Sequence, residues 1–331
     1  MLESSSMRIL VTGGAGYIGS VLTEELVAYG HNVVVCDDLS TGHRSAVSPA
    51  VVFVEGNIGD RDLVVGVLRE HSIEAVMHLA AFSRVEESVK APEKYVENNY
   101  RSSVALFEAM IETGVAKVVF SSTAAVYGEP EKAVLTEDDE TRPINPYGES
   151  KLAVEKALHE YNRKFDFRFV ALRYFNVAGA SKNYGEWHRP ETHLIPRILH
   201  AANGKEDIIE IYGNDYPTRD GTCIRDYIHV QDLAAAHILA LNALGAGSAI
   251  YNLGSGSGYS VNEVVETARR VTGCEIPVQF AGRRVGDPAI LTASSEKIVR
   301  DLGWRPHKGS LDAIIESAWR WLRDHPNGYV D

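Results

Sequence analysis

The sequence predicts an α/β protein with a doubly wound parallel (Rossmann-like) sheet and a smaller C-terminal lobe. Three observations lead to this prediction. Apolar, strand-like runs alternate with helical patterns through the first half of the 331 residues. A glycine-rich segment separates the first run from the first helix, and polar residues follow several later runs. Such alternation is typical of parallel sheets with helices on both faces.

Six runs are predicted as buried strands and four intervening stretches as helices. Strands are expected at residues 8–11, 32–36, 51–54, 75–79, 117–121 and 168–172, and helices at 17–29, 60–70, 92–113 and 146–164. After Gly179 the alternation gives way to shorter elements between loops rich in Gly, Asn, Pro and Asp.

This change in pattern suggests two units. We predict a nucleotide-binding domain at residues 7–179 and a substrate-binding lobe at 180–331. Within the lobe, about 226–255, including a helix at 230–244, is expected to return to the first sheet. Residues 1–6 are interpreted as a leader or a remnant of expression.

The glycine-rich segment has the features of a dinucleotide-binding turn. Gly13, Gly16 and Gly19 follow a predicted strand, and Tyr17 and Ile18 begin the helical pattern. Glycines let the backbone turn sharply and approach a pyrophosphate, which then sits on the amides at the helix N-terminus. An ordinary strand–turn–helix is the alternative interpretation.

Asp37 and Asp38 follow the second strand. An acidic residue here accepts hydrogen bonds from the ribose hydroxyls of an adenosine and repels a further phosphate, which favours NAD over NADP. Arg44 lies close enough in the sequence to leave NADP open.

Other candidates lie at the carboxyl ends of the remaining strands, where ligands of parallel sheets bind. They are Asn57, Ile58, Leu79, Ala80, Ala81, Ser121, Ser122 and Thr123. We expect them to line the same cleft as the glycine-rich segment.

Tyr147 and Lys151 are the strongest candidates for catalysis. Asn145 suits a helix cap and Pro146 the first helical turn, so a spacing of four places both side chains on one face. A positive charge beside a phenol favours the phenolate, which could act as general base toward an alcohol. The alternative is a solvated helix face.

Composition argues against several classes of protein. The net charge of −12 does not suit a general nucleic-acid or acidic-membrane surface. Cys36, Cys223 and Cys274 are widely separated, which predicts no disulfide framework and no metal site, and fits a reducing cytoplasm. No apolar stretch is long enough to span a membrane. The acidic run at 136–140 is interpreted as a solvated loop.

Together these motifs resemble the extended short-chain dehydrogenase/reductase superfamily, and most closely its UDP-glucose 4-epimerase family. The resemblance runs from Met7 onward. Its most specific parts are Leu-Arg-Tyr-Phe-Asn at 172–176, Tyr-Gly-Asn-Asp-Tyr-Pro-Thr at 212–218, and Asp-Gly-Thr-Cys-Ile-Arg-Asp-Tyr-Ile-His-Val at 220–230. Tyr-Asn-Leu-Gly at 251–254 and Arg-Arg-Val-Gly-Asp at 283–287 also match.

The resemblance implies interconversion of UDP-galactose and UDP-glucose. NAD would oxidise C4 of the sugar, the 4-keto intermediate would turn over, and the hydride would return to the other face. Tyr147 would take the O4 proton, Lys151 would hold the nicotinamide ribose and tune the phenol, and Thr123 would bond O4. A homodimer packed through the helices at 92–113 and 146–164 is also implied.

The resemblance assigns further ligand contacts. For NAD it adds Asn98 and Phe175 to the residues named above, and residues 180–331 become a UDP-sugar-binding lobe. The implied UDP-sugar contacts are Asn176, His193, Leu194, Tyr212, Arg225, Arg284, Asp287 and Leu291. Arg225 and Arg284 can make charge-assisted hydrogen bonds to a diphosphate.

Four positions depart from the family's pattern. Asn57 stands where many relatives carry aspartate, and Ser83, with Arg84 beside it, where lysine is frequent. His193 replaces a frequent asparagine. Leu291 lies where some relatives place a ring against the sugar, and we expect this aliphatic side chain to leave room for an N-acetyl group at C2.

Two other functions stay open on this scaffold. An NAD-dependent nucleotide-sugar 4,6-dehydratase needs an acid and a base beside Thr123, where this chain has Ala124 and Ala125. A non-catalytic, NAD-sensing regulatory protein would have no need of the Tyr147–Lys151 pair. A dehydrogenase or a decarboxylase on the same scaffold lacks supporting residues.

Overall fold

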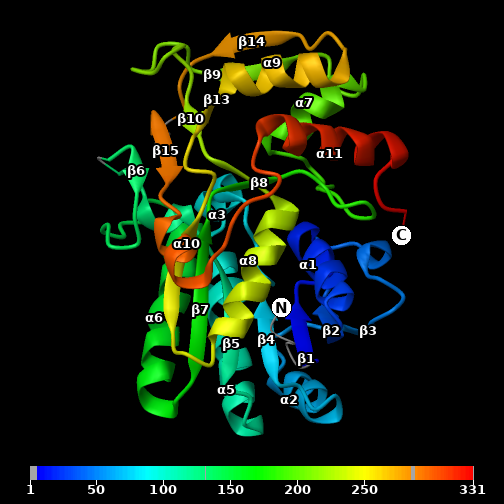
Figure 1. The fold of residues 1–331 in the computed structure, drawn as a ribbon, viewed down its shortest axis with the longest axis vertical. Coiled ribbons are helices and arrows are strands. Elements are labelled where there is room, and N and C mark those ends of the chain that lie inside the picture. Colours follow the sequence, from blue (N-terminus) through cyan, green and yellow to red (C-terminus); the bar gives the residue numbers. More distant parts are fainter. Residues whose placement is uncertain (1–5, 131, 285–287, 331) are drawn as a thin grey trace.

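A seven-stranded parallel sheet forms the centre of the computed structural model, which describes residues 6–130, 132–284 and 288–330 (Figure 1). Its strand order is β12-β7-β5-β4-β1-β2-β3. These strands are β1 (Arg8–Thr12), β2 (Asn32–Asp37), β3 (Val52–Glu55), β4 (Ala75–His78), β5 (Lys117–Thr123), β7 (Arg168–Tyr174) and β12 (Ala249–Leu253). The predicted doubly wound parallel sheet is confirmed, and all six predicted strands form.

The sheet is buried on both faces, because successive side chains of a strand point to opposite sides. In β1, Ile9 and Val11 belong to one hydrophobic core and Leu10 to the other. The first core is closed by α1 (Tyr17–Ala28) and α8 (Val230–Ala243).

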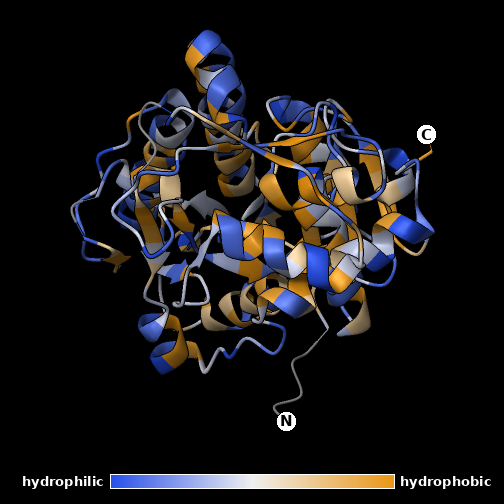
Figure 2. Cartoon of the chain, turned by 90° about the horizontal axis from the view of Figure 1, so that it is seen from above, coloured by the Kyte–Doolittle hydropathy of each residue, from blue (hydrophilic) through white to orange (hydrophobic). Residues whose placement is uncertain are grey.

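The second core is closed by α2 (Arg61–Glu70), α5 (Ser102–Thr113) and α6 (Pro146–Phe165). Figure 2 shows that helices of the chain carry hydrophobic and hydrophilic residues side by side along their length. The burial of one side of α2, α5 and α6 against the sheet explains this mixture.

The helix predicted at 92–113 is interrupted. The chain forms α4 (Pro92–Tyr95), then a π-helical turn at Val96–Arg101, and only then α5. A π-turn inserts an additional residue into the helix and changes which side chains face inward. The buried amide of Asn99 accepts a hydrogen bond from Phe82 N at 2.8 Å and donates one to Phe82 O at 2.9 Å. The turn therefore ties this helix to the loop after β4.

The second half of the chain builds smaller sheets and helices, at the top of Figure 1. One sheet has four strands, in the order β13 (Tyr259–Ser260), β10 (Ile224–Arg225), β15 (Ile290–Ala293) and β6 (Val134–Leu135). Two further sheets have two strands each: β11 (Tyr227–His229) pairs with β8 (Asn176–Ala178), and β14 (Val278–Ala281) pairs with β9 (Ile209–Tyr212). The helices are α7 (Leu194–Ala202), α9 (Val261–Thr272), α10 (Glu296–Leu302) and α11 (Leu311–Asp324). The remaining helical pieces are α3 (Val85–Lys90), η1 (Arg44–Ala46) and η3 (Ala124–Tyr127).

Three elements of this second half, β12, α8 and α10, lie with the first sheet. β12 pairs in parallel with β7, and α8 packs against α1. The predicted helix at 230–244 is thus present as α8. The domain boundary at residue 179 stays a prediction. Within the described residues, no helix has the length and apolar character that crossing a bilayer requires.

Three buried histidines make the free energy of unfolding depend on pH. His78 lies between the hydroxyls of Thr12 and Ser103, 2.8 Å from each. Burial, assisted by the charge of Lys151, lowers the pKa of His78 to about 3. Burial lowers the pKa of His229 and of His237 to about 4.

We expect the protein to lose stability as the pH falls from 6.5 to 5. In this range the unfolded chain takes up protons at these histidines and the folded chain does not, so each histidine contributes a loss on the order of 1 kcal/mol per pH unit. Urea unfolding at a series of pH values measures the slope. His78→Gln should make the slope shallower, and a free energy of unfolding that stays constant over this range would contradict the expectation.

Candidate active site

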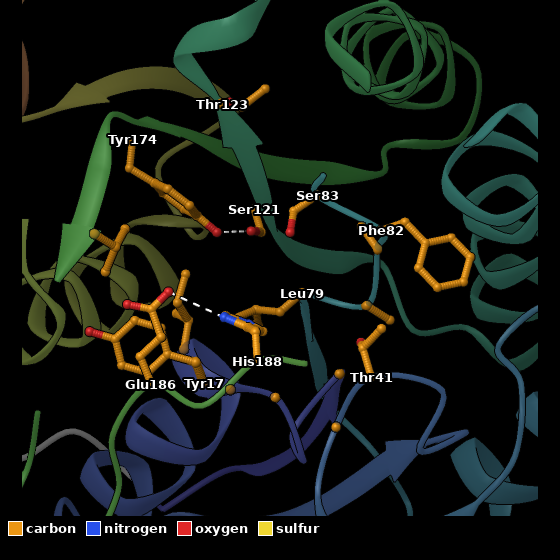
Figure 3. Close-up of a pocket in the computed structure, with 18 of the residues that line it drawn as sticks. Tyr17, Thr41, Leu79, Phe82, Ser83, Ser121, Thr123, Tyr174, Glu186 and His188 are labelled. Carbon is orange, nitrogen blue, oxygen red and sulfur yellow. Dashed lines mark hydrogen bonds and ion pairs between the residues drawn. The ribbon is translucent and has the colours of Figure 1, made fainter. Parts of the chain in front are cut away.

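One pocket lies at the carboxyl ends of the parallel strands, and Figure 3 shows part of its wall. It lies beside β1, where the strand order reverses between β2 and β4, which is the position where such sheets bind ligands. All the predicted cofactor residues line this pocket: Gly13, Gly16, Tyr17, Ile18, Gly19, Asp37, Asp38, Asn57, Ile58, Leu79, Ala80, Ala81, Asn98, Thr123, Tyr147, Lys151 and Phe175. Ser121 also lines it, whereas Ser122 does not, because successive side chains of a strand point to opposite faces.

The turn after β1 has room only for glycine. Gly13 has a φ of +75°, and a Cβ on it would lie 2.6 Å from the backbone nitrogen of Ala80. A Cβ on Gly19 would lie 2.1 Å from the carbonyl oxygen of Gly13. The backbone of the turn at Gly13 therefore lies close to the first residues of α1, and no side chain stands between the turn and the helix. This arrangement fits a pyrophosphate.

The end of β2 supplies a carboxylate to the pocket. Asp37 is buried and accepts hydrogen bonds from Ala15 N at 3.0 Å and Leu39 N at 2.9 Å. Burial raises the pKa of Asp37, against the effect of these two hydrogen bonds. Asn57 donates to Asp38 Oδ2 at 2.9 Å. The guanidinium of Arg44 lies over the ring of Phe53, 4.4 Å from its centroid.

Tyr147 begins α6 at the opposite side of the pocket. The side chain of Asn145 accepts a hydrogen bond from Gly148 N at 2.9 Å, so the predicted cap and helix start are confirmed. A Cβ on Gly148 would lie 2.5 Å from the carbonyl oxygen of Ala125. The glycine lets α6 approach the end of β5 closely, and a hydrogen bond links Tyr147 to Thr123.

Lys151 is buried one turn later on α6. Its Nζ donates to the carbonyl oxygen of Ser121 at 2.8 Å and lies 4.9 Å from the centroid of the Phe120 ring. Burial lowers the pKa of Lys151 to about 7, although the charge of Glu155 opposes this shift.

The expected lowering of the Tyr147 pKa by Lys151 is not found. Burial raises the pKa of Tyr147, and only the hydrogen bond from Thr123 acts in the other direction. The lowering does not occur for two reasons. The ammonium of Lys151 points to a strand carbonyl and bonds it, and the phenol is removed from water.

A buried ion pair supports this arrangement from behind. Arg173 on β7 and Glu155 on α6 form two hydrogen bonds, of 2.9 and 2.6 Å, and both side chains are almost fully buried. Ser122 also donates to Glu155 at 2.5 Å. The pair fixes α6 against β5 and β7. The sequence analysis did not identify it, because its partners are distant in the chain.

The pocket also contains residues that sequence reasoning missed. Ser121 and Tyr174 bond each other through their hydroxyl groups inside it (Figure 3). Both stand at the carboxyl ends of the neighbouring strands β5 and β7, and the sequence analysis selected Ser121 from this position but did not identify Tyr174 or the contact between the two side chains. Phe82 and Ser83 line the wall after β4.

The predicted sugar-nucleotide residues divide into two groups. Asn176, His193 and Leu194 line the pocket together with Thr123 and Tyr147. The others described lie in the second half of the chain and are not among the lining residues of this pocket: Tyr212, Arg225, Arg284 and Leu291. Asp287 lies outside the described residues.

This second group is arranged as two pairs. The guanidinium of Arg284 lies 3.9 Å from the centroid of the Tyr212 ring. Arg225 and Leu291 are neighbours in register between β10 and β15, and Arg225 donates to the carbonyl oxygen of Pro288 at 2.8 Å.

His193 is part of a network that the sequence analysis did not identify. Its Nδ1 lies 2.8 Å from a carboxylate oxygen of Glu186 and 3.0 Å from one of Glu191. His188 contacts the same carboxylates, and its ion pair with Glu186 is drawn in Figure 3. Burial opposes a charge on these rings, but the two carboxylates raise the pKa of His188 to about 9 and that of His193 well above its usual value.

Comparisons with known proteins agree with this geometry. Residues 9–254 match the model of the NAD dependent epimerase/dehydratase family. The chain is 52% identical over 329 residues to a UDP-glucose 4-epimerase of Lacticaseibacillus casei, covering 98% of this chain and 99% of the relative.

Solved structures are similarly close. A UDP-glucose 4-epimerase from Brucella ovis in complex with NAD is 45% identical, with a TM-score of 0.93, and the match covers 96% of this chain and 98% of that one. The UDP-Glc/GlcNAc 4-epimerase from Campylobacter jejuni is 40% identical, with a TM-score of 0.86 and coverage of 96% and 100%.

We expect Gly19→Ala to disrupt the turn that fits the pyrophosphate. The methyl group would collide with the carbonyl oxygen of Gly13, and we expect a loss of about 1–3 kcal/mol in the free energy of unfolding together with loss of bound NAD. Urea unfolding and assay of the dinucleotide released on denaturation measure the two effects.

Gly66→Ala is the matched control. Gly66 lies within α2 with open space where its Cβ would point, and alanine is favoured over glycine inside a helix by about 0.5–1 kcal/mol. This variant should be slightly more stable and keep its dinucleotide. Equal behaviour of the two variants would refute the steric argument.

Proposed function

The chain belongs to the NAD dependent epimerase/dehydratase family, and from this premise we propose that it is a UDP-glucose 4-epimerase. It interconverts UDP-galactose and UDP-glucose by oxidation at C4, rotation of the 4-keto intermediate and return of the hydride. The observation that carries the proposal is one pocket that joins the glycine turn to Thr123, Tyr147 and Lys151.

Bound NAD supplies the hydride acceptor and the returning hydride. The residues of this chain handle the proton. We assign to Tyr147 the removal of the proton from O4 and its return at the end of the cycle. Thr123 holds O4 by a hydrogen bond. Both residues line one pocket, and the Thr123 hydroxyl lowers the pKa of the Tyr147 phenol by hydrogen bonding, which supports this assignment.

Lys151 is assigned a positioning and electrostatic role. Its ammonium lies in the pocket, anchored on the carbonyl oxygen of Ser121, and burial brings its pKa to about 7. An anion that forms on the neighbouring phenol favours the protonated lysine, and the protonated lysine favours that anion.

The UDP portion is assigned to the second half of the chain. Asn176, His193 and Leu194 extend the pocket toward it. Arg225 and Arg284 supply two positive charges for the diphosphate, and the ring of Tyr212 offers a face for the uracil. Asp287 keeps its predicted contact with the ribose.

The alternative functions have less support. At the start of η3, Ala124 and Ala125 offer no group that could move a proton, as a 4,6-dehydratase requires. A non-catalytic sensor would not need a phenol, a hydroxyl and an ammonium in one pocket. NADP is disfavoured because the Asp37 carboxylate occupies the end of β2 and Arg44 stacks on Phe53.

The activity test uses the purified protein without added NAD. UDP-galactose should be converted to UDP-glucose, with no NADH released and no water lost from the sugar. NADH release in proportion to the sugar consumed would indicate a dehydrogenase, and a 4-keto-6-deoxy product a dehydratase; either result overturns the proposal. The same assay with UDP-N-acetylglucosamine tests the prediction that Leu291 leaves room for an N-acetyl group.

Tyr147→Phe should lower kcat by about 10²–10⁴-fold, because the variant lacks the hydroxyl that exchanges the proton. The ring stays in place, so bound NAD and thermal stability should be retained. Tyr29→Phe removes a hydroxyl from an exposed tyrosine after α1 and should leave kcat unchanged. Full activity of Tyr147→Phe would remove this residue from the mechanism.

We further propose that the protein forms a homodimer through α5 and α6. A groove between these helices is lined by apolar side chains, among them Val104, Ile111, Ala153 and Ala157, and Phe165 at its end is 52% exposed. A second copy would cover these groups. The three cysteines are unpaired, which supports a cytoplasmic location.

Light scattering should give twice the mass of one chain for the native protein. Ala157→Glu places a larger, charged side chain among the apolar groups of the groove, and we expect it to yield a monomer because close packing of a second copy would be blocked and the carboxylate would lose water. Ala50→Glu, in an exposed turn, is the control and should remain dimeric. A native monomer would refute this interface.

A further inference from the structure

Four side chains beside the pocket have the composition of a metal centre. Glu186, His188, Glu191 and His193 lie in the segment that leads from β8 to α7. Each offers one nitrogen or oxygen atom, and these four atoms all lie within 4.8 Å of one another. Imidazole nitrogen and carboxylate oxygen are ligands of zinc and of related divalent transition metals.

The spacing of these atoms is close to that of a tetrahedral site. Bonds of about 2.0–2.2 Å from zinc imply roughly 3.3–3.5 Å between neighbouring ligand atoms. Nδ1 of His188 lies 3.3 Å from Glu186 Oε1 and 3.4 Å from Glu191 Oε2. Nδ1 of His193 is somewhat closer to Glu186 Oε1, at 2.8 Å, and its 3.0 Å contact with Glu191 is made to Oε1, the carboxylate oxygen outside this set. Shifts of a few tenths of an ångström at His193 would complete the arrangement.

Two of the four atoms have no hydrogen bond. Nδ1 of His188 and Oε2 of Glu191 are shielded from solvent, and neither has a hydrogen-bond partner within the described residues. The side chain of Glu191 is only 5% exposed and directs this oxygen at the cluster. Leaving buried polar atoms without partners is costly, and a cation between them would satisfy both.

The charge of the cluster also suits a divalent cation. Glu186 is as buried as Glu191, at 7% exposure. Within the described residues, the ion pairs of these two carboxylates are made with His188 and His193, and none is made with a lysine or an arginine. Two buried carboxylates balance one divalent cation when the imidazoles bind it in their neutral form.

We propose that Glu186, His188, Glu191 and His193 form a structural binding site for one divalent transition metal ion, with zinc as the best-fitting metal. Four protein ligands are typical of a structural rather than a catalytic zinc site. The site lies outside the proton-transfer group at Tyr147 and goes beyond the proposed activity.

Residues around a metal site usually hold its ligands in place by hydrogen bonds, and this cluster has such contacts. Oε1 of Glu191 accepts hydrogen bonds from the backbone nitrogens of Thr192 at 2.7 Å and His193 at 2.8 Å, which fixes the carboxylate. The carbonyl oxygen of Trp187 lies 3.1 Å from His43 Nε2. The metal would thus hold the segment against the loop after β2, and with it His193 and Leu194 on the pocket wall. Coordination through Nδ1 leaves Nε2 of His193 for the diphosphate.

The first test is metal content. The full-length protein is purified without a polyhistidine tag, dialysed against metal-free buffer, and analysed by inductively coupled plasma mass spectrometry. We expect about one zinc or related divalent ion per chain. After removal by a strong chelator, addition of Co²⁺ should produce the visible absorption bands of tetrahedral cobalt, and Zn²⁺ should restore the original melting temperature.

Variants locate the metal. His188→Gln and Glu191→Gln should each lower the bound metal at least about tenfold and abolish the cobalt bands. His200→Gln is the control, because His200 is a half-buried histidine of α7 near this segment but outside the four ligands. It should keep its metal.

Three results would overturn the proposal. The native protein could contain no divalent metal and give neither cobalt bands nor a change in melting temperature, which would leave a metal-free ion-pair network. His188→Gln and Glu191→Gln could retain the metal, or His200→Gln could lose it. None of these measurements depends on epimerase activity, so this proposal and the proposed function can fail separately.

Discussion

The parallel register of the central strands is the constraint on which the pocket depends. Thr12 is paired with His78, and Thr123 with Tyr174, so the strands end at one common level. A dinucleotide turn and a catalytic hydroxyl more than a hundred positions apart in the chain therefore lie in the same pocket. Register slips are strongly opposed because the strands are buried on both faces, and a shift of one residue would exchange the two cores.

At the carboxyl ends of the strands, two glycines allow neighbouring backbone segments to approach each other closely. Glycine at position 13 brings the first turn against the loop after β4, and Gly148 brings α6 against Ala125. The Arg173–Glu155 pair holds α6 in this position from the buried side. Phenol, threonine hydroxyl and ammonium are thereby placed in one pocket. Burial raises the pKa of Tyr147 and lowers that of Lys151, so their protonation depends on what shares the pocket with them.

The second half of the chain adds groups of another kind to one wall of the pocket. The segment with Glu186, His188 and His193 lines this wall, whereas the parallel sheet contributes backbone turns and hydroxyls. Two arginines and an aromatic ring lie outside the pocket lining. This division suits a reaction between two ligands that each contain a nucleotide. The dinucleotide has to be held in one fixed position, whereas the sugar of the other ligand has to be able to turn. A metal ion in the segment would make one part of this wall rigid without touching the reacting atoms.

The sequence by itself determined the features that are local. Each of these features depends on only a few neighbouring residues, and the structure contains them where they were expected. They are the strand periodicity, the glycine turn, Asp37 at the end of β2, and the helix cap and four-residue spacing at Tyr147 and Lys151. The motif resemblance added Asn98 and Phe175, which local patterns do not mark and which line the same pocket.

Only the tertiary structure decided the rest. The π-turn at Val96–Arg101, the hydroxyl contact of Ser121 with Tyr174 and the ion pair of Glu155 with Arg173 join segments distant in sequence. The cluster at Glu186–His193 has a readable spacing, but its meaning depends on the loop that turns all four side chains inward. The pKa shifts of Tyr147 and Lys151 follow from burial and from the direction of an ammonium group. Spacing along a helix fixes which face a side chain occupies, but the surrounding fold fixes its solvation and its partners.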